Sequence, residues 1–267
     1  MPLVAESIES TLAGGTAVPR VQLLGISVDV MNMRQTVATL REWIDQPWQR
    51  CRYVVTPNVD HVVLLQHHAG LRQAYADADL VLADGWPLVL ASRWLGRALP
   101  GRVPGSDVVP ALFATQQPMH VFLLGAAPGV AERAAERIRA TWAHVNVTGT
   151  YSPPLGFERD TAENLHILRL IEEARPDLLV VGLGAPKQEL WVHEYSPQLR
   201  AKVALCVGAT IDFLAGHRRR APKWMQRIGL EWLHRMLCEP RRLAGRYLRD
   251  AVVFPSIVLR EWLRRAP

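Results

Sequence analysis

Six short apolar runs recur along the chain, and each ends in glycine or in polar residues typical of a turn. The runs are RYVV (52–55), DLVLA (79–83), HVFLLG (120–125), VNVTG (145–149), DLLVVGLG (177–184) and KVALCVGA (202–209). Between them lie stretches with helical periodicity, such as 128–142 and 161–174. Continuous apolar strands that alternate with amphipathic helices are typical of a parallel sheet covered on both faces. The sequence therefore predicts an α/β fold with a mostly parallel sheet.

The end of the chain has a different composition. After about residue 216 the strand signals stop, and the remaining sequence is helical and rich in arginine. From 217 to 267 there are 13 Lys+Arg against 4 Asp+Glu, whereas the other 216 residues hold 18 against 21, so the net charge of +6 comes from this end. Such an asymmetry favours a polyanionic partner: a membrane surface, a diphosphate or nucleic acid. Prolines 222, 240 and 255 are expected to divide this end into short helices.

These observations predict three parts: a flexible leader (1–20), an α/β domain (21–216) and a helical, basic appendage (217–267). The leader lacks the basic start of a signal peptide and carries two glutamates. The three cysteines are odd in number and scattered, which suits a reducing compartment. The longest late apolar run, AVVFPSIVL (251–259), is far shorter than the roughly 20 residues of a membrane-spanning helix. We expect a soluble or peripheral protein.

Glycines and polar side chains gather where the predicted strands end. In an open parallel sheet, ligands bind at the carboxyl ends of the strands. Glycine lets the backbone approach a ligand, and the free N–H groups of a helix start attract anions. A phosphate-bearing ligand is therefore the favoured hypothesis, although any α/β fold needs such turns and GLGAPK (182–187) matches neither the dinucleotide fingerprint nor a Walker loop. The candidates are Thr56, Asn58, Asp84, Gly125, Gly182, Gly184, Lys187, Gln188, Glu189, Gly208 and Asp212.

Asp84 is the strongest candidate for a general base. It follows an apolar strand and precedes Gly85, so its carboxylate should project at the sheet edge, where partial burial raises a carboxyl pKa toward a useful value. The alternative is an Asx-turn or an N-cap for the helix expected near 87–95. Asp77 and Asp79 have the DxD spacing of a metal site, but they are better interpreted as boundary residues of a helix and a strand. No metal site is predicted.

Several motifs occur in the order found in one known family. They are TPN (56–58), ADLVLADG (78–85), RVPGSD (102–107), FLLG…PG (122–129), GLGAPKQE (182–189), VGATIDFLAG…RAP.W (207–224) and GLEWLHRMLCEPRR…RY (229–247). Over roughly residues 22 to 250 the chain resembles the WecG/TagA/CpsF family, glycosyltransferase family 26. The resemblance implies a Rossmann-like domain with helices on both faces of the sheet and a C-terminal membrane-binding appendage.

The same resemblance implies an inverting glycosyltransferase that needs neither a metal nor another cofactor. It would move a sugar from a UDP-sugar to a polyprenyl-diphosphate-linked sugar, as a peripheral protein at the cytoplasmic face of the bacterial inner membrane. Relatives are associated with glucose, N-acetylmannosamine or its uronic acid, in the synthesis of exopolysaccharides and surface polymers. The sequence does not choose among these donors, and it leaves open a homo-oligomer.

The resemblance also implies roles for individual residues. Asp84 would be the general base, Thr56 and Asn58 would line its pocket, and Arg102 would act on the diphosphate. The stretch Lys187–Glu189 would lie at the nucleotide-sugar cleft formed with the glycine turns, and Asp212 has no assigned role. The appendage residues Arg235, Arg242, Arg246 and Trp232 would meet the acceptor diphosphate or the membrane. The family often has Arg-Arg-Tyr where this chain has Gly-Arg-Tyr (245–247).

The appendage has an amphipathic pattern of its own. Arginines 235, 242, 246 and 249 share one side of a helix if Pro240 does not break the register, and Trp232, Met236, Leu243 and Tyr247 form an apolar face beside it. A basic amphipathic helix with Trp and Tyr fits the bilayer interface. The alternative is an ordinary helix whose apolar face covers the main domain. A non-catalytic membrane or nucleic-acid-binding protein is a competing function, although no recognised nucleic-acid motif is present.

Overall fold

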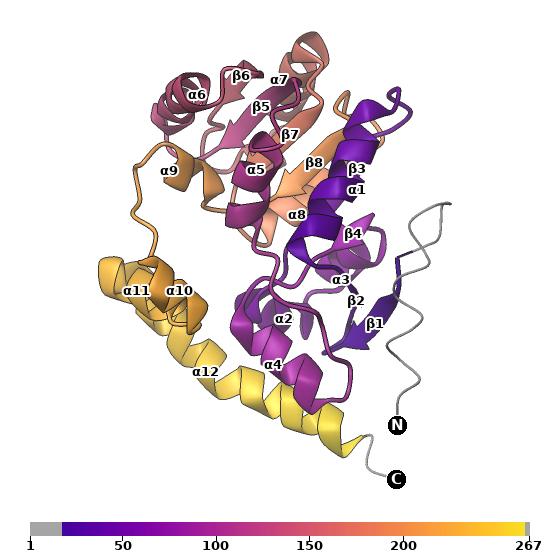
Figure 1. The fold of residues 1–267 in the computed structure, drawn as a ribbon, viewed down its shortest axis with the longest axis vertical. Coiled ribbons are helices and arrows are strands. Elements are labelled where there is room, and N and C mark those ends of the chain that lie inside the picture. Colours follow the sequence, from indigo (N-terminus) through magenta and orange to yellow (C-terminus); the bar gives the residue numbers. More distant parts are fainter. Residues whose placement is uncertain (1–17, 265–267) are drawn as a thin grey trace.

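The structure is a computed structural model that describes residues 18–264. Its centre is a six-stranded sheet with the strand order β4-β3-β8-β7-β5-β6 (Figure 1), and every neighbouring pair is parallel. All six predicted strands are confirmed. Their bounds are β3 (Arg52–Val55), β4 (Leu80–Val81), β5 (Met119–Gly125), β6 (Val145–Tyr151), β7 (Leu178–Gly182) and β8 (Val203–Cys206).

Both faces of the sheet are buried, as the apolar runs predict. In β7, Leu178 and Val180 join one hydrophobic cluster while Leu179 and Val181 join the other, because successive side chains of a strand point to opposite faces. The first face is covered by α1 (Met33–Asp45), α5 (Gly105–Phe113), α6 (Val130–Thr141) and α9 (Thr210–Leu214). The second is covered by α2 (Val59–Leu65), α3 (Ala69–Ala76), α4 (Trp86–Trp94), α7 (Thr161–Ala174) and α8 (Lys187–Tyr195), with a short 3-10 helix, η1 (Phe157–Arg159), before α7.

A small antiparallel hairpin, β1 (Arg20–Leu23) and β2 (Ile26–Asp29), lies outside the main sheet. The hairpin was not predicted from the sequence, because the contact that fastens it joins residues 52 positions apart. Asp29 fastens the hairpin, since its carboxylate accepts hydrogen bonds from Arg20 at 2.8 Å and from the backbone N–H of Val81 at 2.7 Å. Residues 1–17 of the predicted leader lie outside the described residues, and Arg20 belongs to β1.

Three helices form the C-terminal appendage: α10 (Lys223–Arg227), α11 (Glu231–Cys238) and α12 (Pro240–Leu263). Figure 1 shows α12 running beneath α2 and α4, with α10 and α11 at its N-terminal end. Pro222 and Pro240 begin helices as predicted, but the prediction that Pro255 ends one was wrong, because α12 continues through it. Ile257 and Val258, buried against the body just after Pro255, hold the helix together where one backbone hydrogen bond is lost. Among residues 18–264, no helix is long and apolar enough to cross a membrane.

Candidate active site

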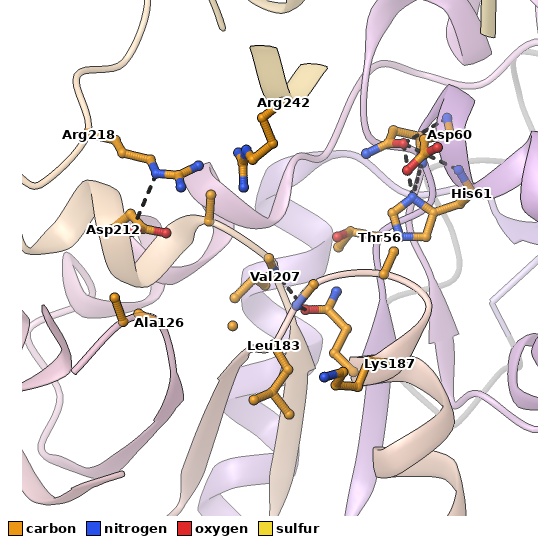
Figure 2. A pocket seen from close by; sticks show the side chains of 18 of the residues that line it. Thr56, Asp60, His61, Ala126, Leu183, Lys187, Val207, Asp212, Arg218 and Arg242 are labelled. Atoms are coloured by element: carbon orange, nitrogen blue, oxygen red, sulfur yellow. Dashed lines mark hydrogen bonds and ion pairs between the residues drawn. The ribbon is translucent and has the colours of Figure 1, made fainter. Parts of the chain in front are cut away.

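A polar cavity of about 360 Å³ opens at the carboxyl edge of the sheet, where loops after β3, β5, β7 and β8 face the appendage (Figure 2). We call it the polar cavity. The structure brings twelve of the predicted site residues to its wall. These are Thr56, Asn58, Asp84, Gly182, Gly184, Lys187, Gln188, Gly208, Asp212, Arg235, Arg242 and Arg246.

A second cavity, of about 370 Å³, lies between α4 and the appendage. Its wall is rich in aromatic side chains, so we call it the apolar cavity. These side chains are Trp86, Phe213, Trp232, Tyr247 and Phe254. Two further predicted residues, Arg102 and Trp232, line this cavity and not the polar one.

The two cavities share part of their walls. The shared residues are Asn58, Asp60, Asp84, Val207, Ala209, Arg235 and Arg246. A group on this shared wall can contact a molecule in either cavity. Asp84 and Asp60 are the carboxylates there, and Asp60 is already paired with Arg246 and Arg249 of the appendage.

Asp84 is not a helix cap. Its backbone N–H donates to the carbonyl of Pro57 at 2.8 Å. The N-cap of α4 is Gly85, with φ of 109°, and no side chain caps the helix. The alternative interpretation as an N-cap is therefore wrong. Burial raises the pKa of Asp84 to about 6, with Glu231 acting in the same direction, while Arg235, His61 and Arg102 oppose the rise. Such a carboxylate is ionised at neutral pH and basic enough to accept a proton.

Three glycines allow the turns after β5, β7 and β8 to pack against one another. A Cβ on Gly125 would lie 2.6 Å from the carbonyl of Gly182, and a Cβ on Gly182 would lie 2.8 Å from the carbonyl oxygen of Gly208. Any larger residue at Gly125 or Gly182 would push the turns apart. Gly125 itself is not on the wall of the polar cavity, so its contribution is to the packing of the turns behind it.

The three polar residues at the start of α8 have different surroundings. Lys187 lines the polar cavity and pairs with Glu158 at 3.0 Å. Gln188 also reaches the cavity, but its side-chain oxygen accepts hydrogen bonds from the N–H groups of Gly184 at 3.3 Å and Gly208 at 3.1 Å. Glu189 is fully buried behind the wall. Lys187 is thus the charged residue of this stretch that lines the cavity, where Glu158 already pairs with it.

Thr56, Asn58 and Asp212 hold the shape of the cavity through hydrogen bonds and ion pairs. The Thr56 hydroxyl donates to the carbonyl of Cys206 at 3.0 Å, which ties β3 to β8. Asn58 caps α2 by accepting from the N–H of Asp60 at 3.0 Å. Asp212 pairs with Arg218 at 3.5 Å. Each side chain therefore has a protein partner as well as a place on the wall.

Four arginines converge on the polar cavity: Arg218, Arg235, Arg242 and Arg246. Figure 2 shows Arg218 and Arg242 on one side of the cavity and Lys187 on another. Burial lowers the pKa of Arg242, and the positive charges of Arg218, Arg235 and Arg246 lower it further, against the opposing effect of Glu239. Arg218 and Arg242 pair with the same carboxylate, Glu239, at 2.8 and 2.7 Å, and the gathering of four guanidinium groups on one wall favours a bound anion.

Sequence reasoning missed Arg218, and it missed His61 and Asp60 on the opposite side of the cavity. The basic run HRRR (217–220) carried a signal for Arg218, since it directly follows the last strand–turn–helix unit. His61 lies one helical turn after Asn58 and gave no comparable signal. Its position on the wall follows from the packing of α2.

The predicted amphipathic pattern of the appendage is broken at Pro240. Arg235 lies on α11, whereas Arg242, Arg246 and Arg249 lie on α12. Of the predicted apolar face, Leu243 is buried, whereas Trp232 is 43% exposed and meets Tyr247 edge-on, with ring centroids 5.9 Å apart, at the apolar cavity. Leu243 therefore fits the alternative of a helix face that covers the main domain, and membrane contact by Trp232 stays a prediction.

The DxD aspartates are boundary residues, as expected. Asp77 ends α3, and the Asp79 carboxylate accepts a hydrogen bond from the N–H of Tyr53 at 2.9 Å. Within residues 18–264, no three His, Cys, Asp or Glu side chains lie close enough together to hold a metal ion.

Comparison with known proteins places this α/β chain among the glycosyltransferases. Residues 21–267 match the model of the Glycosyl transferase WecG/TagA/CpsF family, and the chain belongs to that family. Two similar proteins are from Staphylococcus aureus, strains MRSA252 and NCTC 8325, and both are named N-acetylglucosaminyldiphosphoundecaprenol N-acetyl-beta-D-mannosaminyltransferase. They are 28% and 27% identical to this chain over 226 residues, which cover 84% of the chain and 87% of each relative.

Proposed function

We propose that this protein transfers N-acetylmannosamine from its UDP-sugar to N-acetylglucosamine linked to polyprenyl diphosphate, with inversion, in the synthesis of a bacterial surface polysaccharide. The names of the staphylococcal relatives support this choice of sugar and acceptor over glucose or the uronic acid. The observation that carries the mechanism is the position of Asp84 on the wall shared by the polar and apolar cavities.

The polar cavity is the proposed site of the UDP-sugar. Its four arginines offer bidentate donors to a diphosphate, and Lys187 adds a further cation. A leaving diphosphate gains negative charge as the glycosidic bond breaks, and preorganised cations stabilise that charge in the transition state. Because these cations belong to the protein, we expect turnover to persist in EDTA.

The apolar cavity is the proposed site of the acceptor. Its aromatic wall suits the sugar and the first isoprene units of a lipid-linked substrate. Three cations could bind the diphosphate of the acceptor: Arg102, which pairs with Glu231 at 3.3 Å, and Arg235 and Arg246 on the shared wall.

The reaction follows from this arrangement. The Asp84 carboxylate takes the proton of the acceptor hydroxyl, and the oxygen attacks the anomeric carbon from the side opposite to the diphosphate. A new C–O bond forms as the bond to UDP breaks, and UDP leaves with the electron pair. Holding the two substrates in adjoining cavities supplies the required alignment.

The appendage and α4 are the proposed membrane contact. Exposed apolar side chains stand on the outer surface of α12, and Trp262 of α12 stacks on Trp94 of α4 with ring centroids 5.9 Å apart. The exposed side chains on α12 are Leu248, Val252, Leu259, Trp262 and Leu263. Together with the net positive charge of this end, they suit an anionic lipid surface.

The test is release of UDP from a panel of UDP-sugars (N-acetylmannosamine, its uronic acid and glucose) with a short-chain lipid-diphosphate-N-acetylglucosamine acceptor in EDTA. We expect acceptor-dependent turnover of UDP-N-acetylmannosamine, and a loss of about 100-fold or more in Asp84→Asn, the scale of a general base. Activity of the wild type should fall as pH decreases through about 6, because the base must be ionised. Asp45→Asn, an exposed change on α1, serves as control.

Turnover with another donor would correct the sugar. No turnover with any donor would overturn the enzymatic proposal in favour of a membrane adaptor.

A further inference from the structure

A chain of hydrogen-bonded polar side chains lies behind the polar cavity. The ring of His61 contacts Asn58 Oδ1 through Nδ1 at 2.9 Å and Glu189 Oε1 through Nε2 at 3.1 Å. The same Glu189 oxygen accepts a hydrogen bond from Gln188 Nε2 at 2.7 Å. Gln188 Oε1 in turn holds the N–H groups of Gly184 and Gly208. The chain therefore runs without a break from the start of α2 to two glycine turns.

This chain joins three separate elements of the sheet edge. Asn58 and His61 begin α2 after β3, Gln188 and Glu189 begin α8 after β7, and Gly208 follows β8. Asn58 and His61 line the polar cavity, as do Gln188, Gly184 and Gly208. The links thus set how the wall near Asp84 is placed relative to the turns on the far side of the cavity.

The buried carboxylate of Glu189 lowers the stability of the fold. Its side chain is fully buried, and its second oxygen, Oε2, has no hydrogen-bond partner among the described residues. A buried carboxylate is costly unless it is paired. Burial lowers the pKa of His61, but the hydrogen bond to Glu189 and its charge outweigh that effect, so the pKa rises on balance. The Glu189 carboxylate thus favours the protonated ring, and Nδ1 also lies 3.3 Å from the backbone N–H of Asn58, which donates to it in the capping box of α2.

We propose that His61 and Glu189 are positioning residues for the UDP-sugar. Through Glu189, His61 fixes the amide of Gln188, and Gln188 then holds the two glycine N–H groups in the orientation that closes the polar cavity around the nucleotide diphosphate. This inference deepens the proposed function, on which it rests. It assigns donor binding to two residues that need not touch the donor's reacting atoms.

The proposed role of His61 and Glu189 predicts a specific effect on the KM values. Loosening the glycine turns affects the polar cavity and leaves the apolar cavity intact, so the KM for the UDP-sugar should change while the KM for the acceptor does not. A residue that merely supports the fold would change both constants together, in step with the thermal stability.

The experiment compares Glu189→Leu, Glu189→Gln and His61→Asn with the wild type. Leucine at position 189 removes the oxygen that accepts hydrogen bonds from Gln188 and His61. Glutamine at the same position retains such an oxygen. In the third, the asparagine side chain is too short to reach Glu189. The control is Glu194→Leu, an exposed change on the same helix. The readouts are the Kd of UDP by calorimetry, both KM values, kcat and thermal melting.

We expect Glu189→Leu to weaken UDP binding and raise the donor KM about tenfold or more, with the acceptor KM within twofold. Glu189→Gln should stay within about threefold of the wild type, and His61→Asn should fall between them. His61→Asn decides the question if Glu189→Leu does not fold. Wild-type protein that binds no UDP overturns the proposed function and this proposal with it. Wild-type binding of UDP that persists unchanged in the folded variants overturns the positioning proposal alone.

Discussion

The α/β body and the C-terminal appendage are held by different forces. Strands β3, β7 and β8 are almost wholly buried, and their side chains fill two apolar clusters. By contrast, none of the residues of α11 is buried, and four of the 24 residues of α12 are, although the structure describes both helices in full. Apart from apolar contacts of residues such as Ile257 and Val258, the appendage is fastened through charged groups. Asp60 pairs with Arg246 and Arg249, and Glu261 accepts from the N–H of Leu24 at 2.6 Å.

The candidate site is built from both the body and the appendage. Apolar burial places the glycine turns and Asp84 independently of salt, whereas partly exposed ion pairs contribute little and are screened by salt. Arg246 both holds the appendage to Asp60 and lines the two cavities. Docking of the appendage and completion of the candidate site are therefore coupled. Different variants can distinguish the two effects.

The largest expected effect is on nucleotide binding by the appendage. Arg242→Ala removes from the polar cavity a cation that pairs with Glu239 at 2.7 Å, and a lost hydrogen bond to a charged group is worth about 1.5–3 kcal/mol, or roughly 10- to 100-fold in the Kd of UDP. The matched control is its exposed neighbour Arg241→Ala, which lines neither cavity. Calorimetry measures both. Equal Kd values for the two variants would show that the body alone binds the nucleotide.

The next effect concerns lipid contact. Leu248→Asp with Val252→Asp places two charges on the exposed surface of α12, where burial of an apolar side chain contributes about 1.5–3 kcal/mol. Binding to anionic vesicles should weaken about tenfold or more, while turnover of a short-chain soluble acceptor stays unchanged. Leu165→Asp, on the exposed side of α7, is the control. Unchanged sedimentation with vesicles would remove the appendage from the membrane contact.

Besides lowering activity, Asp84→Asn should stabilise the body. The folded pKa of Asp84 lies above its unfolded value, so the folded state binds more protons and stability falls as pH rises from about 4 to about 6. Above pH 6 the wild type is less stable for this reason by about 1–3 kcal/mol, which the variant avoids. Thermal melting at pH 8 should show the gain, and it should vanish near pH 4. A gain that is equal at both pH values would contradict this origin.

The smallest effect is on docking of the appendage. Asp60→Asn weakens two ion pairs to α12, at a cost of about 1 kcal/mol given their partial exposure. Hydrogen exchange of the α12 amides should quicken in the variant, and also in wild type at 1 M salt, while that of β7 does not. Asp45→Asn, which weakens a partly buried pair within α1, should leave α12 unaffected. Salt-independent protection of α12 would mean that apolar contacts hold it.

Much of the body could be predicted because its signals are local. The run DLLVVGLG (177–184) contains its own strand, its glycine turn and the approach to α8, and neighbouring parallel strands bring such turns to one edge. Asp84 was found for the same reason. The β1–β2 hairpin was not predicted, because it depends on Asp29 bonding to Val81, which lies 52 residues away.

The roles of polar residues within the site were less predictable. Gln188 and Glu189 were expected to meet the nucleotide-sugar, yet Gln188 binds two backbone N–H groups and Glu189 is buried beside His61. Gln188 and Gly208 are 20 positions apart in the sequence, and His61 and Glu189 are 128 apart. Contacts over such separations depend on tertiary packing and cannot be predicted from the spacing of residues. Likewise, Arg102 faces the apolar cavity because α11 presents Glu231 to it.

By itself, the sequence determined the six strands of the main sheet and their alternation with helices, the two buried faces of the sheet, the family and the positive charge of the C-terminal end, because hydrophobic periodicity, turn chemistry and composition are properties of neighbouring residues. Only the tertiary structure decided which strands are neighbours, that α11 and α12 close two adjoining cavities, and that Asp84 lies on the wall between them. Those features arise when side chains distant in the chain are buried together, and burial is a property of the whole fold.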